Sequence, residues 1–409
     1  MRKHKNLVSC IIMMAFMISI MLPVAPAYAF SISDLVGQTT GTTDAGGTKS
    51  LSTDKGFLNI LLGLLLGNLL GKSDSVPAGG STKGNSGSGL TSSKDLVGFY
   101  AEWWGEDTSS YNSMVKNADV IKTIAPFWAT MQADGSVTDR GGNDHASVVK
   151  TAHQNNMTVL LLVNNAKQDT GTTPVHTVLA DPVLRTRAID NFEKYIKKYN
   201  LDGVNVDFEM VPAEDKDNLT AFMRELYARL KPQGYIVSID VFPKQDETND
   251  VAAAYDYAEL AKYADKIMIM TYDNHGTWSG AGPIADINWV ERNLKYALKA
   301  IPKNKLYLGI AAYGYDWSAQ GVQSLEYKAI MDLAQRYGKT VQWDDASQSP
   351  YFSYTATDGT AHTIWFENSQ SLNQKLALIN QYDIAGAAMW KLGEEDPSAW
   401  NVLRKQFNK

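Results

Sequence analysis

Cysteine is almost absent from this chain, because Cys10 is the only one in 409 residues. It falls in a stretch where a short basic segment precedes an apolar run, 11–22, and the tripeptide Ala27-Tyr28-Ala29. This order is typical of a secretory signal peptide, residues 1–29, which is cleaved after Ala29. The apolar run is short for a membrane span, which disfavours an uncleaved anchor. The mature chain then has no thiol, which excludes disulfide bonds and a cysteine nucleophile.

An excess of basic charge and a cluster of histidines are also lacking. The chain has 38 Lys and Arg against 44 Asp and Glu, a net charge of −6 and a pI near 5.6. Binding to nucleic acid is therefore not expected, since it favours a basic patch. The 6 histidines are scattered without a His-x-x-x-His pair, so we expect no metal centre and no cofactor. Export without disulfides fits a bacterial protein that is extracellular or associated with the cell wall or spore.

Residues 30–94 lack the periodicity of a folded domain. Gly, Ser, Thr and Asp dominate, which predicts a low-complexity region and linker. Within it, segment 57–71 is apolar all round, and Gly63, Gly67 and Gly71 recur every four residues. On a helix these glycines form one smooth stripe that allows close approach of a partner. We expect either a role in attachment to a membrane or wall or in self-association, or a helix that packs on the main domain.

Residues 95–409 read as one domain of repeated strand and helix. Helical periodicity appears between short β-rich runs, for example over 183–199, 216–230 and 287–300. Eight such repeats predict an α/β fold, a closed (β/α)8 TIM barrel. The expected strands are Leu96–Ala101, Val120–Trp128, Thr158–Val163, Gly203–Phe208, Ile236–Phe242, Lys266–Tyr272, Lys305–Ala312 and Ala385–Trp390.

A long stretch separates the seventh expected strand from the eighth. Val341–Asp344 and His362–Phe366 alternate in polarity on either side of a polar turn, Asp358-Gly359. These features predict a small α+β insertion over about residues 316–368. Helical patterns near 324–337 and 371–382 bracket the two strands.

The most informative segment is residues 202–209, Asp-Gly-Val-Asn-Val-Asp-Phe-Glu. In a strand, Asn205, Asp207 and Glu209 share one face, because side chains alternate with period two. Val, Val and Phe on the other face indicate a buried strand rather than a solvated acidic edge. Clustered acids raise the pKa of one of them, which is what a general acid requires.

This segment resembles the family 18 glycoside hydrolase signature Asp-x-x-Asp-x-Asp-x-Glu, with Asn205 at the second Asp. Met270-Thr271-Tyr272-Asp273 is similar to the family's Met-x-Tyr-Asp motif, and Trp390 falls where the family has a tryptophan. The family's Ser-x-Gly-Gly motif is missing from 160–165. The resemblance covers about residues 95–409. The Asn205 variant, Phe208 and the closing 389–393 most resemble the spore-cortex and peptidoglycan-active N-acetylglucosaminidases.

The resemblance implies hydrolysis of β-1,4 bonds in N-acetylglucosamine-containing polysaccharides: peptidoglycan, spore cortex or chitin. Glu209 would be the proton donor, and the substrate's acetamido oxygen the nucleophile, in a retaining reaction. Asp207 would orient the acetamide, and Tyr272 would hydrogen-bond its carbonyl. Asp273 would bind sugar hydroxyls, and Trp390 would stack on the sugar ring.

Other polar and aromatic residues near the ends of the expected strands are further candidates for substrate binding. Asn205 can hold Asp207 by a hydrogen bond but cannot take its proton as an Asp would. Asp202 is expected to be structural. The remaining candidates are Tyr100, Asn164, Met270 and Tyr313.

Two alternatives to an enzyme use the same fold. One is a non-catalytic carbohydrate-binding protein, and the other is a wall-layer or spore-layer assembly protein driven by 57–71. Non-catalytic relatives of the family have typically lost the acid. The presence of Glu209 therefore favours the enzyme.

Overall fold

The computed structural model describes residues 94–407 except 104–105, 167–172 and 248–250. The expected signal peptide, low-complexity region and segment 57–71 lie outside the described residues. Among the helices that are described, none has the length and apolar character needed to cross a membrane.

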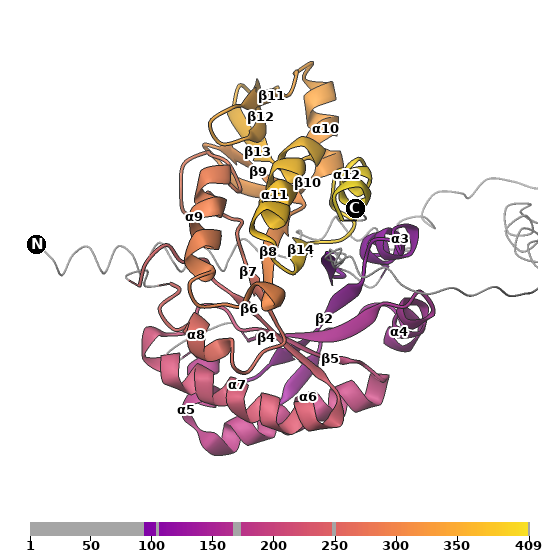
Figure 1. Cartoon of the computed structure of the whole chain (residues 1–409). Coiled ribbons are helices and arrows are strands. Elements are labelled where there is room, and N and C mark those ends of the chain that lie inside the picture. Colours follow the sequence, from indigo (N-terminus) through magenta and orange to yellow (C-terminus); the bar gives the residue numbers. More distant parts are fainter. Residues whose placement is uncertain (1–93, 104–105, 167–172, 248–250, 408–409) are drawn as a thin grey trace, which may run out of the picture. The chain divides into compact units, whose positions relative to one another are not determined.

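The centre of the described chain is a parallel sheet that closes on itself (Figure 1). The neighbours run β1-β14-β8-β7-β6-β5-β4-β2, and β1 pairs with both β14 and β2, so the ring has no free edge. The expected TIM barrel is confirmed. Within the described ranges its eight strands are β1 Asp95–Tyr100, β2 Thr123–Met131, β4 Thr158–Asn165, β5 Gly203–Asp207, β6 Ile236–Val241, β7 Lys266–Ile269, β8 Leu306–Ala311 and β14 Gly386–Trp390.

Most strand bounds differ from the prediction by one or two residues, but β2 begins three residues later and β7 ends three residues earlier, because tight turns remove residues from the ladder. Val120 and Ile121 donate backbone hydrogen bonds to Asn117 O, so β2 begins only at Thr123 and continues to Met131. A short strand, β3 (Val137–Asp139), pairs antiparallel with the end of β2. The Thr271 N–H donates to Ile269 O at 2.8 Å, so β7 ends at Ile269 rather than at Tyr272.

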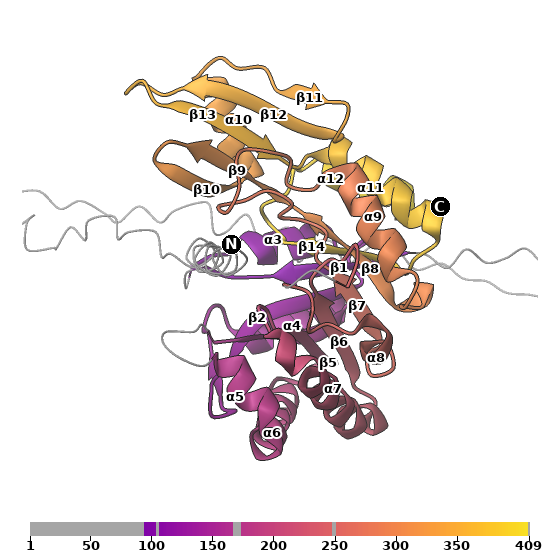
Figure 2. The same cartoon turned by 90° about the vertical axis from the view of Figure 1, so that its left-hand side faces the viewer.

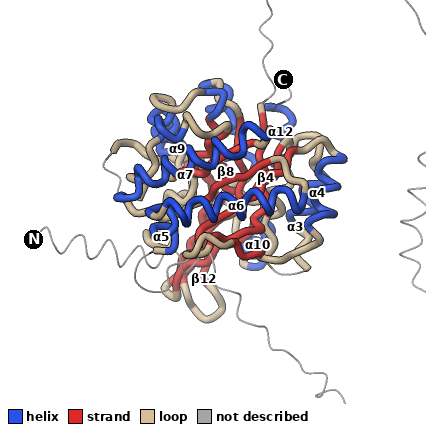
Figure 3. The backbone as a smooth tube through the Cα atoms, turned by 90° about the horizontal axis from the view of Figure 1, so that it is seen from below, coloured by secondary structure: helices blue, strands red, loops and turns tan. Residues whose placement is uncertain are grey.

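Helices surround the strands, and local capping sets their ends (Figure 3). The longest, α6, begins at Pro182, where the Asp181 side chain accepts from Val183 N, and ends at the left-handed Asn200. An Asp cap followed by Pro at the first helical position, and an Asn at the C-cap, are residue types that favour the start and the end of a helix. The α-helices of the barrel are α3 Ser109–Lys116, α4 His145–Gln154, α5 Pro174–Ala180, α6 Pro182–Tyr199, α7 Lys216–Leu230, α8 Tyr257–Leu260, α9 Ile287–Ala297, α11 Ser369–Tyr382 and α12 Ala399–Phe407.

Alternation along the strands produces two apolar cores. Val204, Val206 and Phe208 belong to the large core between the strands and the helices. Val97 and Phe99 belong to a small core inside the barrel. The opposite face of β5 therefore points into the barrel, as the period-two pattern predicted.

A second sheet is built between β8 and α11 (Figure 2). Two strands were predicted here, but the described chain has five, and 341–344 does not pair with 362–366. Strand β12 lies between them because its buried Phe352 packs against Ile364 and Phe366. The order is β10-β9-β13-β12-β11, with β9 Tyr313–Ser318, β10 Gly321–Glu326, β11 Gln342–Asp344, β12 Ser349–Thr355, β13 Ala361–Phe366 and helix α10 Tyr327–Arg336.

The start of this sheet also differs from the predicted 316. Strand β9 begins at Tyr313, and only Ala312 separates it from the end of β8, so the second sheet continues directly from a barrel strand. The helical pattern near 324–337 was placed three residues too early, because Ser324 pairs with Tyr315 in the sheet.

A buried ion pair joins the end of β13 to α11. Lys375 Nζ lies 2.7 Å from Glu367 Oε2, both side chains are at most 3% exposed, and Ser371 Oγ donates to the same oxygen. A single buried charge without its partner is strongly unfavourable, since it is desolvated and unpaired.

We expect Lys375→Met to destabilise the chain by about 3–5 kcal/mol, because Glu367 would keep its burial and lose its partner. The double variant Glu367→Leu/Lys375→Met should be closer to wild type. Urea unfolding followed by circular dichroism measures both. Equal midpoints for the single variant and the wild type would contradict a stabilising role for the pair.

Candidate active site

The predicted acidic strand ends at the mouth of the barrel. Asn205 and Asp207 lie on the inward face of β5 and are 0% and 8% exposed, respectively. Glu209 follows the strand end and is partly exposed. The C-terminal ends of barrel strands are where active sites are built in this fold. The structure therefore places Glu209, the expected proton donor, at the rim, and Asp207, two residues before it, deeper in the barrel.

Hydrogen bonds to the backbone hold Glu209 in place. Asn165, at the end of β4, accepts from Glu209 N at 2.8 Å and donates through Nδ2 to Glu209 O at 3.1 Å. Tyr255 OH donates to Phe208 O at 2.6 Å. The next residue, Met210, has a φ of 53° and turns the chain away. Asn165 is thus a positioning residue, although the prediction chose its neighbour Asn164.

Asp240 is a buried carboxyl group of the site that the sequence prediction missed. It lies on β6, is 2% exposed, and its Oδ2 accepts from Asn205 Nδ2 at 2.5 Å. Ser238 Oγ donates to Asn205 Oδ1 at 2.7 Å, which turns the Asn205 amide nitrogen toward Asp240. Ser238 and Asp240 alternate on one face of their strand, and this pattern could have identified Asp240 beside an acidic neighbour.

Tyr272 and Asp273 follow β7 in the same rim. Tyr313 and Tyr315, both on β9, donate to Asp273 Oδ1 at 2.6 and 3.0 Å. Burial raises the pKa of Asp273 to about 6, although these two hydrogen bonds lower it. The second sheet thereby supplies two side chains that hold a residue of the barrel rim.

Burial and mutual repulsion raise the pKa values of the acids. For Glu209, burial is the main cause, and the charges of Asp207 and Asp273 add to it. For Asp207, burial again dominates, followed by the charge of Asp240. A carboxylic acid with a raised pKa keeps its proton toward neutral pH. The site can therefore hold a transferable proton on Glu209.

An aromatic cluster is formed by residues of β1, β2 and β14 and by Trp103, which follows β1. The Trp390 ring, at the end of β14, is 5.6 Å from Phe99 and 6.2 Å from both Trp103 and Phe127, measured between ring centroids. Trp103 is 39% exposed, while Phe99 faces the barrel interior. Aromatic faces of this kind suit the apolar face of a ring-shaped ligand.

Tyr100 does not belong to this site, which corrects its predicted place among the substrate-binding residues. Its side chain is 0% exposed, packs against Trp128 outside the barrel, and donates to Glu102 at 2.7 Å. The reason is strand parity, because Phe99 points into the barrel and the next residue points out.

The other predicted residues lie at or near the rim in different environments. Asn164 pairs in register with Asp207, and its Oδ1 accepts from Thr130. Met270 is 8% exposed, and its N–H donates to Val241 O. Tyr313 is 4% exposed, and its hydroxyl donates to Asp273.

Asp202, expected to be structural, lies before β5. It accepts hydrogen bonds from Val159 N at 2.7 Å and His153 Nε2 at 2.9 Å. Within the part of the chain that the structure describes, no group of His, Cys, Asp and Glu side chains could hold a metal ion.

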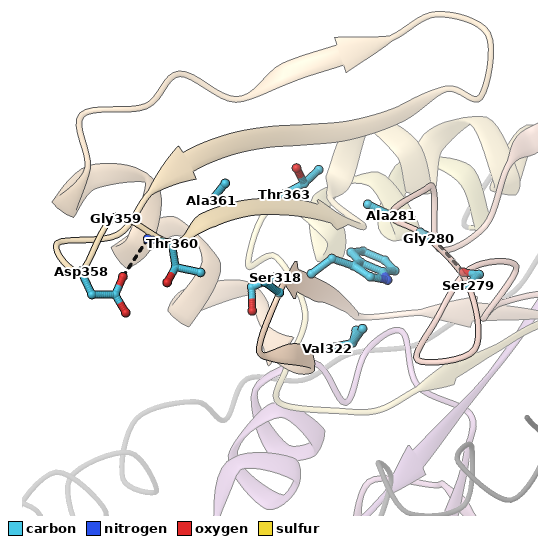
Figure 4. Close-up of a pocket in the computed structure, with 12 residues that line it drawn as sticks. Ser279, Gly280, Ala281, Ser318, Val322, Asp358, Gly359, Thr360, Ala361 and Thr363 are labelled. Atoms are coloured by element: carbon cyan, nitrogen blue, oxygen red, sulfur yellow. Dashed lines mark hydrogen bonds between the residues drawn. The ribbon is translucent and has the colours of Figure 1, made fainter.

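A surface hollow of about 760 Å³ lies on the second sheet, apart from the acids (Figure 4). Ser279–Ala281, Trp317 and the turn at 358–360 contribute to its lining. Trp317 connects it to the site, because its ring packs on Tyr315, which binds Asp273. The hollow contains none of the predicted acids.

The assembled groups can perform acid catalysis on a bound ring. A protonated carboxyl at the rim can donate to a leaving oxygen, and a neighbouring buried carboxylate can stabilise developing positive charge. Asp207 ends β5 and Glu209 follows two residues later at the same barrel rim, so the two acids approach a ligand from the same side. This geometry differs from two carboxylates that flank a bond from opposite sides.

Known proteins are similar to this chain in sequence and fold. The sequence pattern of glycosyl hydrolases family 18 matches residues 95–395. The uncharacterized glycosylase YvbX of Bacillus subtilis (strain 168) is 31% identical over 304 residues, which cover 73% of this chain and 88% of that protein. The crystal structure of the Bacillus cereus spore cortex-lytic enzyme SleL is similar with a TM-score of 0.72 and 25% identity, over 78% of this chain and 76% of that chain.

A chitinase from Chromobacterium violaceum ATCC 12472 is similar with a TM-score of 0.71 and 27% identity, over 77% of this chain and 99% of that chain. The matched region contains the whole barrel and its acidic strand. The chain therefore belongs to family 18 of the glycosyl hydrolases.

Proposed function

We propose that this chain is a secreted enzyme that cleaves β-1,4 bonds after N-acetylglucosamine with retention of configuration. The observation that carries the proposal is the position of Glu209 at the barrel rim, where Asn165 accepts from its backbone N–H, two residues after the buried Asp207; burial raises its pKa. A proton donor of this kind is what hydrolysis of a glycosidic bond requires. The substrate's own acetamido oxygen serves as the nucleophile, because both acids approach from one side.

Each residue of the rim has a part in this reaction. Glu209 donates its proton to the glycosidic oxygen and later takes a proton from water. Asp207 holds the acetamide nitrogen and stabilises the positive oxazolinium. Tyr272 donates to the acetamide carbonyl, and Asp273 binds sugar hydroxyls through its rim position. Trp390 stacks on the apolar face of the sugar.

The substrate is a glycan that contains N-acetylglucosamine, and peptidoglycan, spore cortex and chitin all qualify. Similarity to a spore cortex-lytic enzyme supports cortex, and similarity to a chitinase supports chitin. The predicted signal peptide supports action outside the cell, at the wall or the spore. Product analysis on cortex, vegetative peptidoglycan and chitin oligomers distinguishes these substrates.

Glu209→Gln should lower kcat by about 10²–10⁴-fold, because the amide keeps the shape but has no proton to transfer. Glu214→Gln, which changes an exposed glutamate in the same stretch, is the matched control and should match wild type. Release of reducing ends from the accepted glycan measures both. Turnover of Glu209→Gln within a few fold of wild type would remove Glu209 from the mechanism.

Hydrolysis should depend on the acetamido group of the sugar. De-acetylated oligomers should bind without turnover, because they lack the nucleophile. A thiazoline analogue of the oxazolinium should inhibit more strongly than the product, since it resembles the charged intermediate. Mass spectrometry of enzyme treated with a 2-fluoro sugar provides the opposing test. A covalent adduct on Asp207 or Glu209 would contradict substrate assistance.

We also propose that segment 57–71 attaches the enzyme to a surface or to its own copies, while the barrel works independently. Leu and Ile side chains that stay in water without a partner each forgo about 1.5–3 kcal/mol of burial. A chain that begins near Ser93 should keep full activity on soluble oligomers and lose binding to walls or spores. Light scattering and fractionation compare it with the mature chain. Equal mass and equal partition of the two chains would show that the segment has no such role.

A further inference from the structure

Position 205 is an asparagine, whereas the family 18 signature has an aspartate there, which could take a proton from Asp207. Asn205 is fully buried and its amide cannot accept a proton under ordinary conditions. Asp207 must be ionised to stabilise an oxazolinium, yet burial and neighbouring charge raise its pKa. The site therefore needs another group close to Asp207 that can take a proton while the substrate reacts.

The strand register places Asp240 in that position. Strands β5 and β6 run parallel, with Asn205 beside Ser238 and Val206 beside Ile239. The next step along the same register brings Asp207 beside Asp240. Both acids point into the barrel, because their strand neighbours on either side belong to the outer core.

The hydrogen bonds around Asp240 leave one of its oxygens free. Asn205 Nδ2 donates to Asp240 Oδ2 at 2.5 Å, and the Asn205 carbonyl is occupied by the Ser238 hydroxyl. Among the described residues, Asp240 Oδ1 is buried and has no hydrogen-bond partner. A buried carboxylate oxygen without a partner is costly unless it carries or shares a proton.

We propose that Asp240 exchanges a proton with Asp207 during catalysis and so takes over, from the neighbouring strand, the task that an acid at position 205 would perform. This inference rests on the proposed function of Asp207. Asp240 is a positioning residue, because it acts on the substrate only through Asp207. Asn205 holds Asp240 in place through the hydrogen bond to its Oδ2.

The exchange conserves protons. Before the substrate binds, the two carboxyl groups share one proton. When the acetamide N–H meets Asp207, that proton moves to Asp240, which leaves Asp207 as a carboxylate and Asp240 as a carboxylic acid. After the oxazolinium is hydrolysed, the proton returns. The pair carries one negative charge throughout.

The electrostatic surroundings agree with a shared proton. Burial is the main cause that raises the pKa of Asp240, the Asn205 hydrogen bond lowers it, and the charge of Glu209 raises it further. Within the described ranges, neither Asp207 nor Asp240 has a salt bridge to a cation. Lys266 on the neighbouring strand β7, which pairs with Ser238, is bound to Asp95 and donates to Tyr307 at 2.7 Å. Two adjacent charges without a cation favour sharing one proton.

Exchange of the two side chains provides the kinetic test. Asp240→Asn should lower kcat by about 10²-fold and leave KM within about twofold, because binding is kept and the proton acceptor is lost. Asn205→Asp in that background returns a carboxylate to strand β5 and should regain at least about tenfold in kcat. Asp217→Asn, which changes an exposed aspartate, is the control. Wild-type kcat in Asp240→Asn, or a folded double variant without any recovery, would overturn the proposal.

A spectroscopic readout separates this inference from the proposed function. At pH 8, the infrared difference spectrum between wild type and Asp240→Asn should contain the carbonyl band of a protonated carboxyl group, absent from the Asp217→Asn difference. Loss of carboxylate absorption alone would show that the pair shares no proton. If the wild type hydrolyses none of the N-acetylglucosamine glycans, the proposed function fails, while the infrared band still decides the state of the pair. Circular dichroism verifies that each variant is folded.

Discussion

The burial of several carboxyl groups at one end of the barrel is the constraint on which the rest of the site depends. A charge that leaves water is strongly destabilised, so each buried acid must be protonated, hydrogen-bonded or paired. The site uses the first two solutions, with raised pKa values at Asp207, Glu209 and Asp240 and tyrosine donors at Asp273. Burial of these carboxyl groups destabilises the folded chain, but it also raises their pKa values so that they hold protons toward neutral pH.

Strand parity allows one short segment to serve both stability and chemistry. The side chains at 204, 206 and 208 pack under the helices, while Asn205 and Asp207 face the interior. A slip of one residue in the register would bring the apolar set inside and the acids into the outer core. Because barrel closure gives every strand two hydrogen-bonded neighbours, the fold itself protects this register.

Local patterns predicted most of the fold and the central acids. The eight strands were recognisable because each is a short apolar run between helical periods, and the acids of β5 stand out within one strand. Asp240 was missed because its role arises from a contact with Asn205 on the neighbouring strand, and the role of Asn165 likewise depends on its contact with Glu209. Tyr100 failed for a simpler reason, since being near a strand end does not tell which face a residue occupies.

The second sheet was the least predictable part, because β9 pairs out of chain order with β13, and β12, which was not predicted as a strand, lies between β13 and β11. The pairing depends on packing between β12, β13 and α10, which a local pattern does not reveal. Strand β9 was not predicted either, although it follows β8 after a single residue.

The tyrosines that hold Asp273 lie on β9, so the site constrains the part of the second sheet that adjoins the barrel. Within the described part of the chain, the turns at the other end of the sheet make no hydrogen bond to the acids of the site. The turn between β9 and β10 lies at the opposite end of β9 from Tyr313 and is exposed, as are Asp358 and Gly359. Loop tips of this kind tolerate changes in length and sequence. Evolution can therefore lengthen or reshape the outer wall beside the hollow without moving the acids, so that the range of ligands and the chemistry vary independently.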